Sequence, residues 1–192
     1  KTKDNIIDQD KEPRTVGIDL GINRMVTLSD GTSFESPKPL KNKLRRLKRI
    51  QKKLSKKEKG SKNRLKQLNK VRKLHYKIGN IRKDSLHKVT SFIAGNYSDI
   101  AIEDLNVKGM VKNHNLARHI QDVGFYEFRR QLEYKTTYRN SNLKVVDRFF
   151  PSSKTCSKCQ EIKNDLTLKD RIFKCNCGFV IDRDLGGVYF RV

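Results

Sequence analysis

Short segments of alternating polarity open the chain. In TVGIDL (15–20), apolar residues alternate with small or polar ones, which predicts a strand with Val16, Ile18 and Leu20 on one face and Thr15, Gly17 and Asp19 on the other. The Asp30-Gly31 pair predicts a hairpin turn before TSFES. We therefore expect three short antiparallel strands between residues 15 and 35.

Between residues 41 and 90 the hydrophobic period lengthens. Apolar positions recur in steps of three and four, at Leu44, Leu47, Ile50 and Leu54 and then at Leu65, Leu68, Val71, Leu74, Ile78 and Ile81. These steps predict two amphipathic helices interrupted near EKGSKN, the second continuing toward Phe92 and Ile93.

The rest of the chain mixes both periods. SDIAIEDL (98–105) predicts a buried strand, NVKGMVKNHN a loop, and NLKVVDRFF (142–150) another strand. Between them, Leu116 to about Asn140 predicts one helix with Ile120, Val123, Phe128 and Leu132 facing inward. A possible helix start, DRDLGGVYFRV, closes the chain. Strands alternating with helices predict an α/β fold.

The net charge of the chain indicates what kind of partner it binds. The chain has 44 Lys and Arg against 21 Asp and Glu, a formal net charge of +23 and a pI of about 10.1. Residues 41–90 hold 21 of the basic residues and two acids. A solvated charged face is the plain alternative, but two successive helices with so few acids favour contact with a nucleic-acid backbone. The candidate contacts are Lys41, Lys43, Arg45, Arg46, Lys48, Arg49, Lys52 and Lys53.

Two negative observations bear on location. No apolar run approaches the roughly 18 residues that a membrane span needs. No secretory signal opens the chain. We expect a cytoplasmic protein with no membrane partner.

Four cysteines form two close pairs. Cys156-x2-Cys159 and Cys175-x-Cys177 are separated by fifteen residues. Two such pairs can place four thiolates in a tetrahedron, which predicts a closed structural zinc site with no catalytic role. A redox pair or disulfides are the alternative, and the lack of a secretory signal disfavours them.

Acidic residues in apolar strands are the candidates for chemistry. Asp19 lies within the first strand, Glu103 lies in IAIEDL, and Asp182 and Asp184 follow the second cysteine pair. A buried carboxylate costs several kcal/mol unless it is paired, and three converging carboxylates suit Mg²⁺. Each also has a structural alternative: Asp19 as a turn cap, Glu103 in a salt bridge to the basic helices, and Asp182 or Asp184 as a helix N-cap.

Five segments carry a family resemblance. VGIDLGINRMVTLSDG, IAIEDLNVKGM, FYEFRRQLEYK, FFPSSKTCSKC and KCNCGFVIDRDL occur in the order of the TnpB (OrfB) family of insertion-sequence proteins, relatives of the compact type V CRISPR effectors. The chain resembles this family from about Val16 to Leu185. Family members use a guide RNA to direct cleavage of target DNA in prokaryotic cells, and were long described as transposases.

The resemblance implies a RuvC nuclease of the RNase H-like fold: a mixed sheet with flanking helices, a long basic helical hairpin as an insertion, and an inserted zinc ribbon. It implies a core over residues 1–150 that includes the basic insertion 41–95, a zinc ribbon over 151–180 and a last catalytic segment over 181–192. It implies that Asp19, Glu103 and Asp184 are the catalytic acids and hold two Mg²⁺ ions. We expect Asp104 and Asp182 to cap or support them.

The chain departs from the family in two places. Gly186 and Gly187 follow DRDL where the family usually has Asn and Ala, and the family's N-terminal regions are absent, so we expect the catalytic part of a larger protein. One alternative is a nuclease-inactive protein that binds guide RNA and DNA and has a structural zinc ribbon. Another is an ATPase of the actin and heat-shock chaperone class, which shares GIDLG, but Ile22-Asn23-Arg24 and the chain length argue against it.

Overall fold

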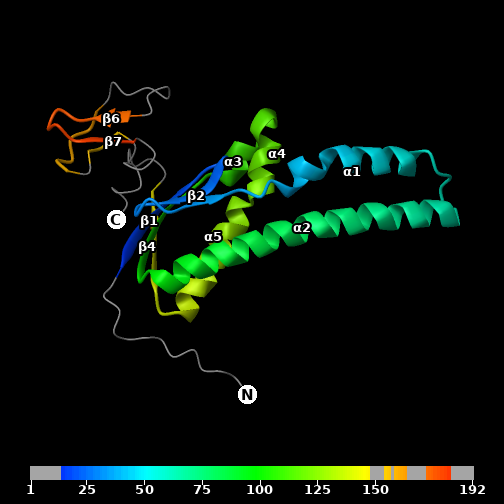
Figure 1. The fold of residues 1–192 in the computed structure, drawn as a ribbon, viewed down its shortest axis with the longest axis horizontal. Coiled ribbons are helices and arrows are strands. Elements are labelled where there is room, and N and C mark those ends of the chain that lie inside the picture. Colours follow the sequence, from blue (N-terminus) through cyan, green and yellow to red (C-terminus); the bar gives the residue numbers. More distant parts are fainter. Residues whose placement is uncertain (1–13, 148–153, 157, 164–171, 183–192) are drawn as a thin grey trace, which may run out of the picture.

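A five-stranded mixed sheet forms the centre of the protein (Figure 1). The computed structural model describes residues 14–147, 154–156, 158–163 and 172–182. Within the sheet the strand order is β3-β2-β1-β4-β5, with β2 and β3 antiparallel to their neighbours and β4 and β5 parallel to β1. The strands are β1 (Thr15–Leu20), β2 (Arg24–Leu28), β3 (Ser33–Glu35), β4 (Asp99–Glu103) and β5 (Asn142–Val146).

Helices supply the other half of the hydrophobic core. They are α1 (Pro39–Ser55), α2 (Lys62–Asn96), α3 (Val107–Val111), α4 (His114–Val123) and α5 (Phe125–Tyr138). Apolar residues of β1 and β4 stand side by side, Val16 opposite Ile100 and Ile18 opposite Ile102. They share one buried cluster with residues of α2, α4 and α5, among them Leu86, Val89, Ile93, Ile120, Phe128 and Leu132.

Several sequence predictions are confirmed. The three antiparallel strands occur, and the Asp30-Gly31 turn joins β2 to β3, with the Gly31 N–H donating to the Leu28 carbonyl. Two helices occupy the basic segment, and the second runs to Asn96. β5 begins at Asn142 as expected and ends at Val146, while residues 148–150 of the predicted strand lie outside the described residues.

Two predictions were wrong. The expected loop after β4 contains the short helix α3, whose first turn is capped by the Asn106 side chain accepting from the Gly109 N–H. The single helix expected from Leu116 to Asn140 is two helices, because Gly124 adopts φ +80° and ends α4. A left-handed glycine ends a helix without steric cost, and α5 starts at the next residue.

The helices α1 and α2 form an antiparallel arm that projects from the sheet (Figure 1). We call residues 39–78 the basic arm. A narrow cluster holds its helices together: Leu47, Val71, Leu74 and Ile78, with Leu40, Ile50 and Leu54 against it. At the tip, Arg64 donates to the carbonyls of Leu54 and Lys57, which places a cation at the C-terminus of α1. With 35 residues, α2 is about 52 Å long.

Asp122 joins the base of the arm to the core. Its buried carboxylate accepts from the N–H groups of Leu40 and Lys41 in the first turn of α1, at 3.1 to 3.2 Å. Arg82 of α2 donates to the Asp122 carboxylate and to its backbone carbonyl, at 2.9 Å each. The residue before α1, Lys38, provides no side-chain cap. A carboxylate some 80 residues away therefore caps this helix.

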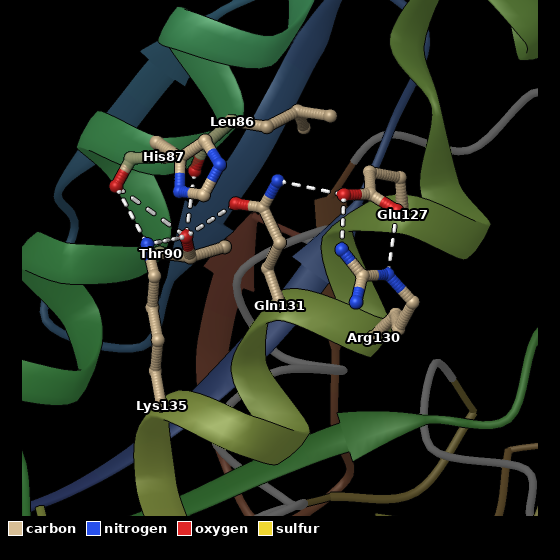
Figure 2. A network of polar contacts seen from close by, with 7 residues as sticks. All are labelled: Leu86, His87, Thr90, Glu127, Arg130, Gln131 and Lys135. Carbon is tan, nitrogen blue, oxygen red and sulfur yellow. Dashed lines mark hydrogen bonds and ion pairs between the residues drawn. The ribbon is translucent and has the colours of Figure 1, made fainter. Parts of the chain in front are cut away.

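A chain of polar contacts fixes α2 against α5 (Figure 2). Lys135 donates to the His87 carbonyl and to the hydroxyls of Thr90 and Ser91, at 2.7 to 2.9 Å. The buried Thr90 hydroxyl can donate its one hydrogen to the Leu86 carbonyl or to the Gln131 side chain. Because every partner lies on one of these two helices, the network fixes their register.

The same network continues along α5. Gln131 donates to Glu127, and the Arg130 guanidinium forms two 2.8 Å hydrogen bonds with the same carboxylate. These Arg130 bonds outweigh burial and hold the pKa of Glu127 at about 2. Glu127 therefore stays ionised, as an acceptor for both neighbours, at neutral pH.

A small separate hairpin lies in the C-terminal part. β6 (Ile172–Lys174) pairs antiparallel with β7 (Val180–Asp182). The helix start predicted at DRDLGGVYFRV begins at Asp182, the last residue of β7, and its other residues lie outside the described residues. Among the residues that the structure describes, no helix is both long enough and apolar enough to cross a membrane.

We expect Asp122→Ala to lower the free energy of unfolding by about 3 kcal/mol, because it leaves two N–H groups of α1 without their acceptor and Arg82 without its carboxylate partner. Urea unfolding measures this loss. Asp84→Ala is the matched control: Asp84 forms an exposed pair with Lys88, so its removal should cost less than about 1 kcal/mol. Equal losses in the two variants would contradict the anchoring role.

Candidate functional site

Two acidic residues lie at or next to the last residue of neighbouring parallel strands. The register of β1 and β4 pairs Gly17 with Ala101 and Ile18 with Ile102. The next residues along the two strands are Asp19 and Glu103, the latter being the last residue of β4. Because side chains alternate between faces, both acids lie on the face of the sheet opposite Ile18 and Ile102. The sheet thus places them side by side at one end.

The surroundings of these acids are small and half-buried. Gly17 and Ala101 precede them on the same face and add little bulk there. Asp19 and Glu103 are themselves neither fully buried nor fully exposed. Because both carboxylates are only half-buried, a cation from solvent can reach their oxygen atoms. All-oxygen donor sets suit Mg²⁺ rather than a soft metal.

Asp104 ties the end of β4 to α5. Its carboxylate accepts from Arg129 at 2.6 Å, and its N–H donates to the Val146 carbonyl of β5 at 2.9 Å. Arg129 also pairs with Glu133 on the next turn of α5. This agrees with the supporting role expected for Asp104. The contacts of Asp104 with Arg129 and Val146 hold the backbone directly after Glu103.

The third candidate acid, Asp184, lies outside the described residues. The described chain ends two positions earlier, at Asp182, which is the last residue of β7. The structure therefore places Asp19 and Glu103 together and does not test Asp184. Its participation stays a prediction.

The four cysteines lie together, as their spacing predicted. The four sulfur atoms are all within 4.8 Å of one another, and none of them forms a disulfide. Cys156 Sγ lies 3.7 Å from Cys177 Sγ, and Cys159 Sγ lies 3.4 Å from Cys175 Sγ. A tetrahedron with zinc–sulfur bonds of about 2.3 Å has edges of about 3.8 Å. The cluster therefore has the dimensions of a four-thiolate metal site.

Two tight turns present these sulfurs. Gln160 N–H donates to the Cys156 carbonyl, and Gly178 N–H donates to the Cys175 carbonyl. Gly178 adopts φ +83°, a conformation that glycine reaches without strain. Burial acts to raise the pKa of the Cys156 thiol, but hydrogen bonds from the N–H groups of Cys159 and Lys158 outweigh it and lower the pKa to about 7. That favours the thiolate of Cys156, the form that binds metal. At Cys175 the Cys177 N–H lowers the pKa, but burial and the neighbouring thiols outweigh it and raise the pKa to about 12.

The predicted nucleic-acid contacts all lie on α1. Seven of them are exposed, namely Lys41, Arg45, Arg46, Lys48, Arg49, Lys52 and Lys53, and Lys43 is half-buried. Leu47 occupies the opposite, buried side of the helix. The amphipathic pattern therefore gives α1 an exposed cationic face opposite its buried one.

Sequence reasoning missed a cavity next to Glu103. Its volume is about 360 Å³, and residues of β1, β4, α3 and α5 line it. The segment FYEFRR, which contributes Phe125, Tyr126, Arg129 and Arg130, stood out only as part of a family motif. Its unusual density of aromatic and arginine side chains was the available signal.

Comparison with known proteins identifies two family models. The family described as "Probable transposase" (OrfB_IS605) matches residues 2–114. A second family, described as "Cas12f1-like, TNB domain", matches residues 125–189 and so includes the four cysteines.

Curated relatives share the likeness along most of the chain. The "Putative RNA-guided DNA endonuclease" of Streptomyces pristinaespiralis is 42% identical over 170 residues, which cover 88% of this chain and 42% of the relative. The "Putative RNA-guided DNA endonuclease InsQ" of Escherichia coli (strain K12) is 37% identical over 188 residues, covering 90% and 46%. The chain therefore spans less than half the length of these relatives.

Solved structures show the same fold. A cryo-EM structure of a Cas12f1–sgRNA–target DNA complex matches 94% of this chain and 50% of its own chain, with a TM-score of 0.63 and 18% sequence identity. A CRISPR–Cas12f ternary complex matches 97% and 40%, with a TM-score of 0.69 and 20% identity. Since its family model matches more than half of the residues, the chain belongs to the OrfB_IS605 family of probable transposases, with curated relatives named as RNA-guided DNA endonucleases.

Proposed function

We propose that this chain is the catalytic part of a metal-dependent nuclease that cuts DNA under the direction of a guide RNA. The observation that carries the proposal is the register of β1 and β4, which puts Asp19 and Glu103 next to each other on one face of the sheet. Support comes from the family and from relatives named as RNA-guided DNA endonucleases.

The proposed architecture is a RuvC domain of the RNase H-like fold. The mixed sheet and its likeness to Cas12f1 support this. The proposed division is a core over residues 1–150 with the basic insertion 41–95, a zinc ribbon over 151–180 and a last catalytic segment over 181–192. In this division the core positions the acids, the insertion binds backbone phosphates, and the ribbon supports the segment that carries Asp184.

Asp19, Glu103 and Asp184 would hold two Mg²⁺ ions. When bound, such ions activate water and neutralise charge on the leaving oxygen of a phosphodiester. The protein holds the acids in place beforehand: β1 and β4 fix Asp19 and Glu103 through their backbone pairing, and Arg129 restrains Asp104 beside them. Because both acids present carboxylate oxygens from neighbouring strands, the site suits a hard divalent cation such as Mg²⁺.

The basic arm would hold the nucleic acid through its phosphates. Its cations contact the backbone without reading the bases, so sequence selection falls to pairing with the guide RNA. The Cas12f1 structure was solved with sgRNA and target DNA, and these are the partners we propose for the parent of this chain.

The Asp19→Asn variant tests the nuclease. In the parent protein loaded with its guide RNA, we expect Mg²⁺-dependent cleavage to fall by more than about 100-fold, since a metal ligand is lost. The apo protein should melt at the same or a higher temperature, because Asn keeps the size of the Asp19 side chain and removes a negative charge from the strand beside Glu103. Gel analysis of a matched DNA measures cleavage, and calorimetry measures melting.

Asp99→Asn is the matched control. Asp99 lies on β4, on the same face as Glu103 but at the other end of the strand, where it accepts from Ser98 and Asn142. The Asp99→Asn variant should cleave DNA at the same rate as the unchanged protein. Near-full cleavage by Asp19→Asn would refute the assignment. A parent that binds guide and target and never cuts would instead be the nuclease-inactive binder.

The cysteine cluster should contain one zinc ion per chain, because its sulfurs match a tetrahedral site. Elemental analysis of the purified protein measures the zinc content. Cys159→Ser should lower it, and cobalt substitution in the unchanged protein should give thiolate-to-metal absorption. A disulfide between any two of these cysteines, or protein purified without zinc, would contradict the site.

Neutral replacements on α1 should weaken the salt dependence of binding. Changing Lys41, Arg45 and Arg49 to Gln removes up to three phosphate contacts, so the slope of log K against log salt for duplex DNA should fall by about two to three. Fluorescence anisotropy across a salt series measures it. The same change at three exposed cations outside the arm, Arg118, Arg139 and Lys144, is the control. Equal slopes for both triples would show that the arm does not contact DNA.

A further inference from the structure

A cavity lies beside Glu103, and the metal chemistry proposed above does not require it. It opens where β1 and β4 end, between those strands, α3 and α5. Its volume of about 360 Å³ lies within the range of small-molecule sites. Ile102 and Phe125, both almost fully buried, belong to its lining. Leu20, Leu105 and Val107 add further apolar surface.

Polar and aromatic side chains also line this cavity. Glu103 lies on one side, and Lys108, Tyr126 and Arg130 are among the other lining residues. Tyr126 is 71% exposed, although Phe125 next to it is buried. An exposed aromatic ring beside an apolar hollow provides a flat face for stacking at low conformational cost.

Charge pairing around the cavity decides which part of a nucleotide fits it. Arg129 is paired with Asp104 and Glu133, and Arg130 is paired with Glu127. These guanidinium groups are thus balanced by carboxylates. Glu103 and Lys108 add one charge of each sign to the lining, so the cavity has no excess of positive charge with which to attract a phosphate. A neutral, planar group with apolar faces is the better occupant, and a nucleobase has that chemistry.

We propose that this cavity binds one base of the strand whose phosphodiester lies at Asp19 and Glu103, with Tyr126 stacking on that base. The inference rests on the proposed nuclease function, since it takes the strand being cut as the ligand. It adds a base-holding subsite beside Glu103. Holding one base would fix the neighbouring phosphate against the metal ligands, as positioning residues do in other enzymes.

The test uses a series of single-stranded DNAs that each lack one base at a different position. The parent protein with its guide RNA is assayed with Ca²⁺ in place of Mg²⁺, so that affinity is measured without cleavage. In the unchanged protein, we expect one position at which the missing base weakens binding about fivefold or more, the value of one stacked base. Fluorescence anisotropy measures each affinity.

Variants of Tyr126 test whether the cavity causes the weaker binding of DNA that lacks this base. In Tyr126→Ala the penalty for the missing base should disappear, because the two changes remove the same contact. Tyr126→Phe should retain the penalty, since its ring still stacks. Tyr76→Ala is the matched control, because Tyr76 is 73% exposed on α2 and does not line the cavity. It should retain the penalty as well.

Two results would overturn the inference: no position shows a penalty, or the penalty persists in Tyr126→Ala. The first would follow if other residues of the parent fill the cavity. Asp19→Asn separates this inference from the nuclease, because it should lose cleavage and keep the base penalty. A base penalty in a parent that never cuts would support the subsite and refute the nuclease. Cleavage without a base penalty would do the reverse.

Discussion

The buried carboxylate of Asp122 is the contact on which the arrangement of the helices depends. It lies on α4, caps the first turn of α1 and pairs with Arg82 of α2. Burying a charge costs several kcal/mol, and here two backbone N–H groups and a guanidinium offset that cost. Because the three helices meet at one side chain, the direction in which the basic arm leaves the core is set at this point.

From that junction α2 continues into the core without interruption. Its outer part packs on α1 through Val71, Leu74 and Ile78, and its inner part packs on the sheet through Leu86, Val89 and Ile93. The contacts of Lys135 and Gln131 then lock it to α5, the helix that also carries Arg129. A continuous series of packed elements thus runs from the basic arm to the end of β1 and β4 that carries Asp19 and Glu103. Nucleic acid held by the arm would keep a fixed position relative to Asp19 and Glu103.

The sequence predicted what depends on neighbours along the chain. The period of two in TVGIDL and the steps of three and four in residues 44–81 each reflect one element packing one face, so they were visible without a structure. The spacing of the cysteines was equally local, and their sulfurs do lie together. The register that pairs β1 with β4 joins residues more than 80 positions apart, and no local pattern encodes it. Asp19 and Glu103 were grouped in advance only as acids in apolar strands, and the family motifs gave them a shared role.

Three features were not predicted, because the pattern of apolar positions reveals neither the backbone conformation of one residue nor contacts between distant elements. The helix predicted across residue 124 is broken because the backbone there turns left-handed, while the hydrophobic period continues from Val123 to Phe128. Asp122 looked like an ordinary polar residue on a helix, because its partners Leu40 and Arg82 come from other helices. The cavity likewise arises where four elements meet, so its lining residues are scattered along the sequence.

The construction of the basic arm has a consequence for how this family can diverge. Outside its base, each layer of the arm is one turn of α1 against one turn of α2, closed at the tip by a glycine with φ +87°. Removing or adding seven residues in both helices would therefore move the tip by about 10 Å and leave every contact at Asp122 unchanged. The length of the basic arm can therefore change in evolution almost independently of the sheet. The number of turns in α1 and α2 therefore sets how far the tip of the arm lies from the end of β1 and β4 that carries Asp19 and Glu103.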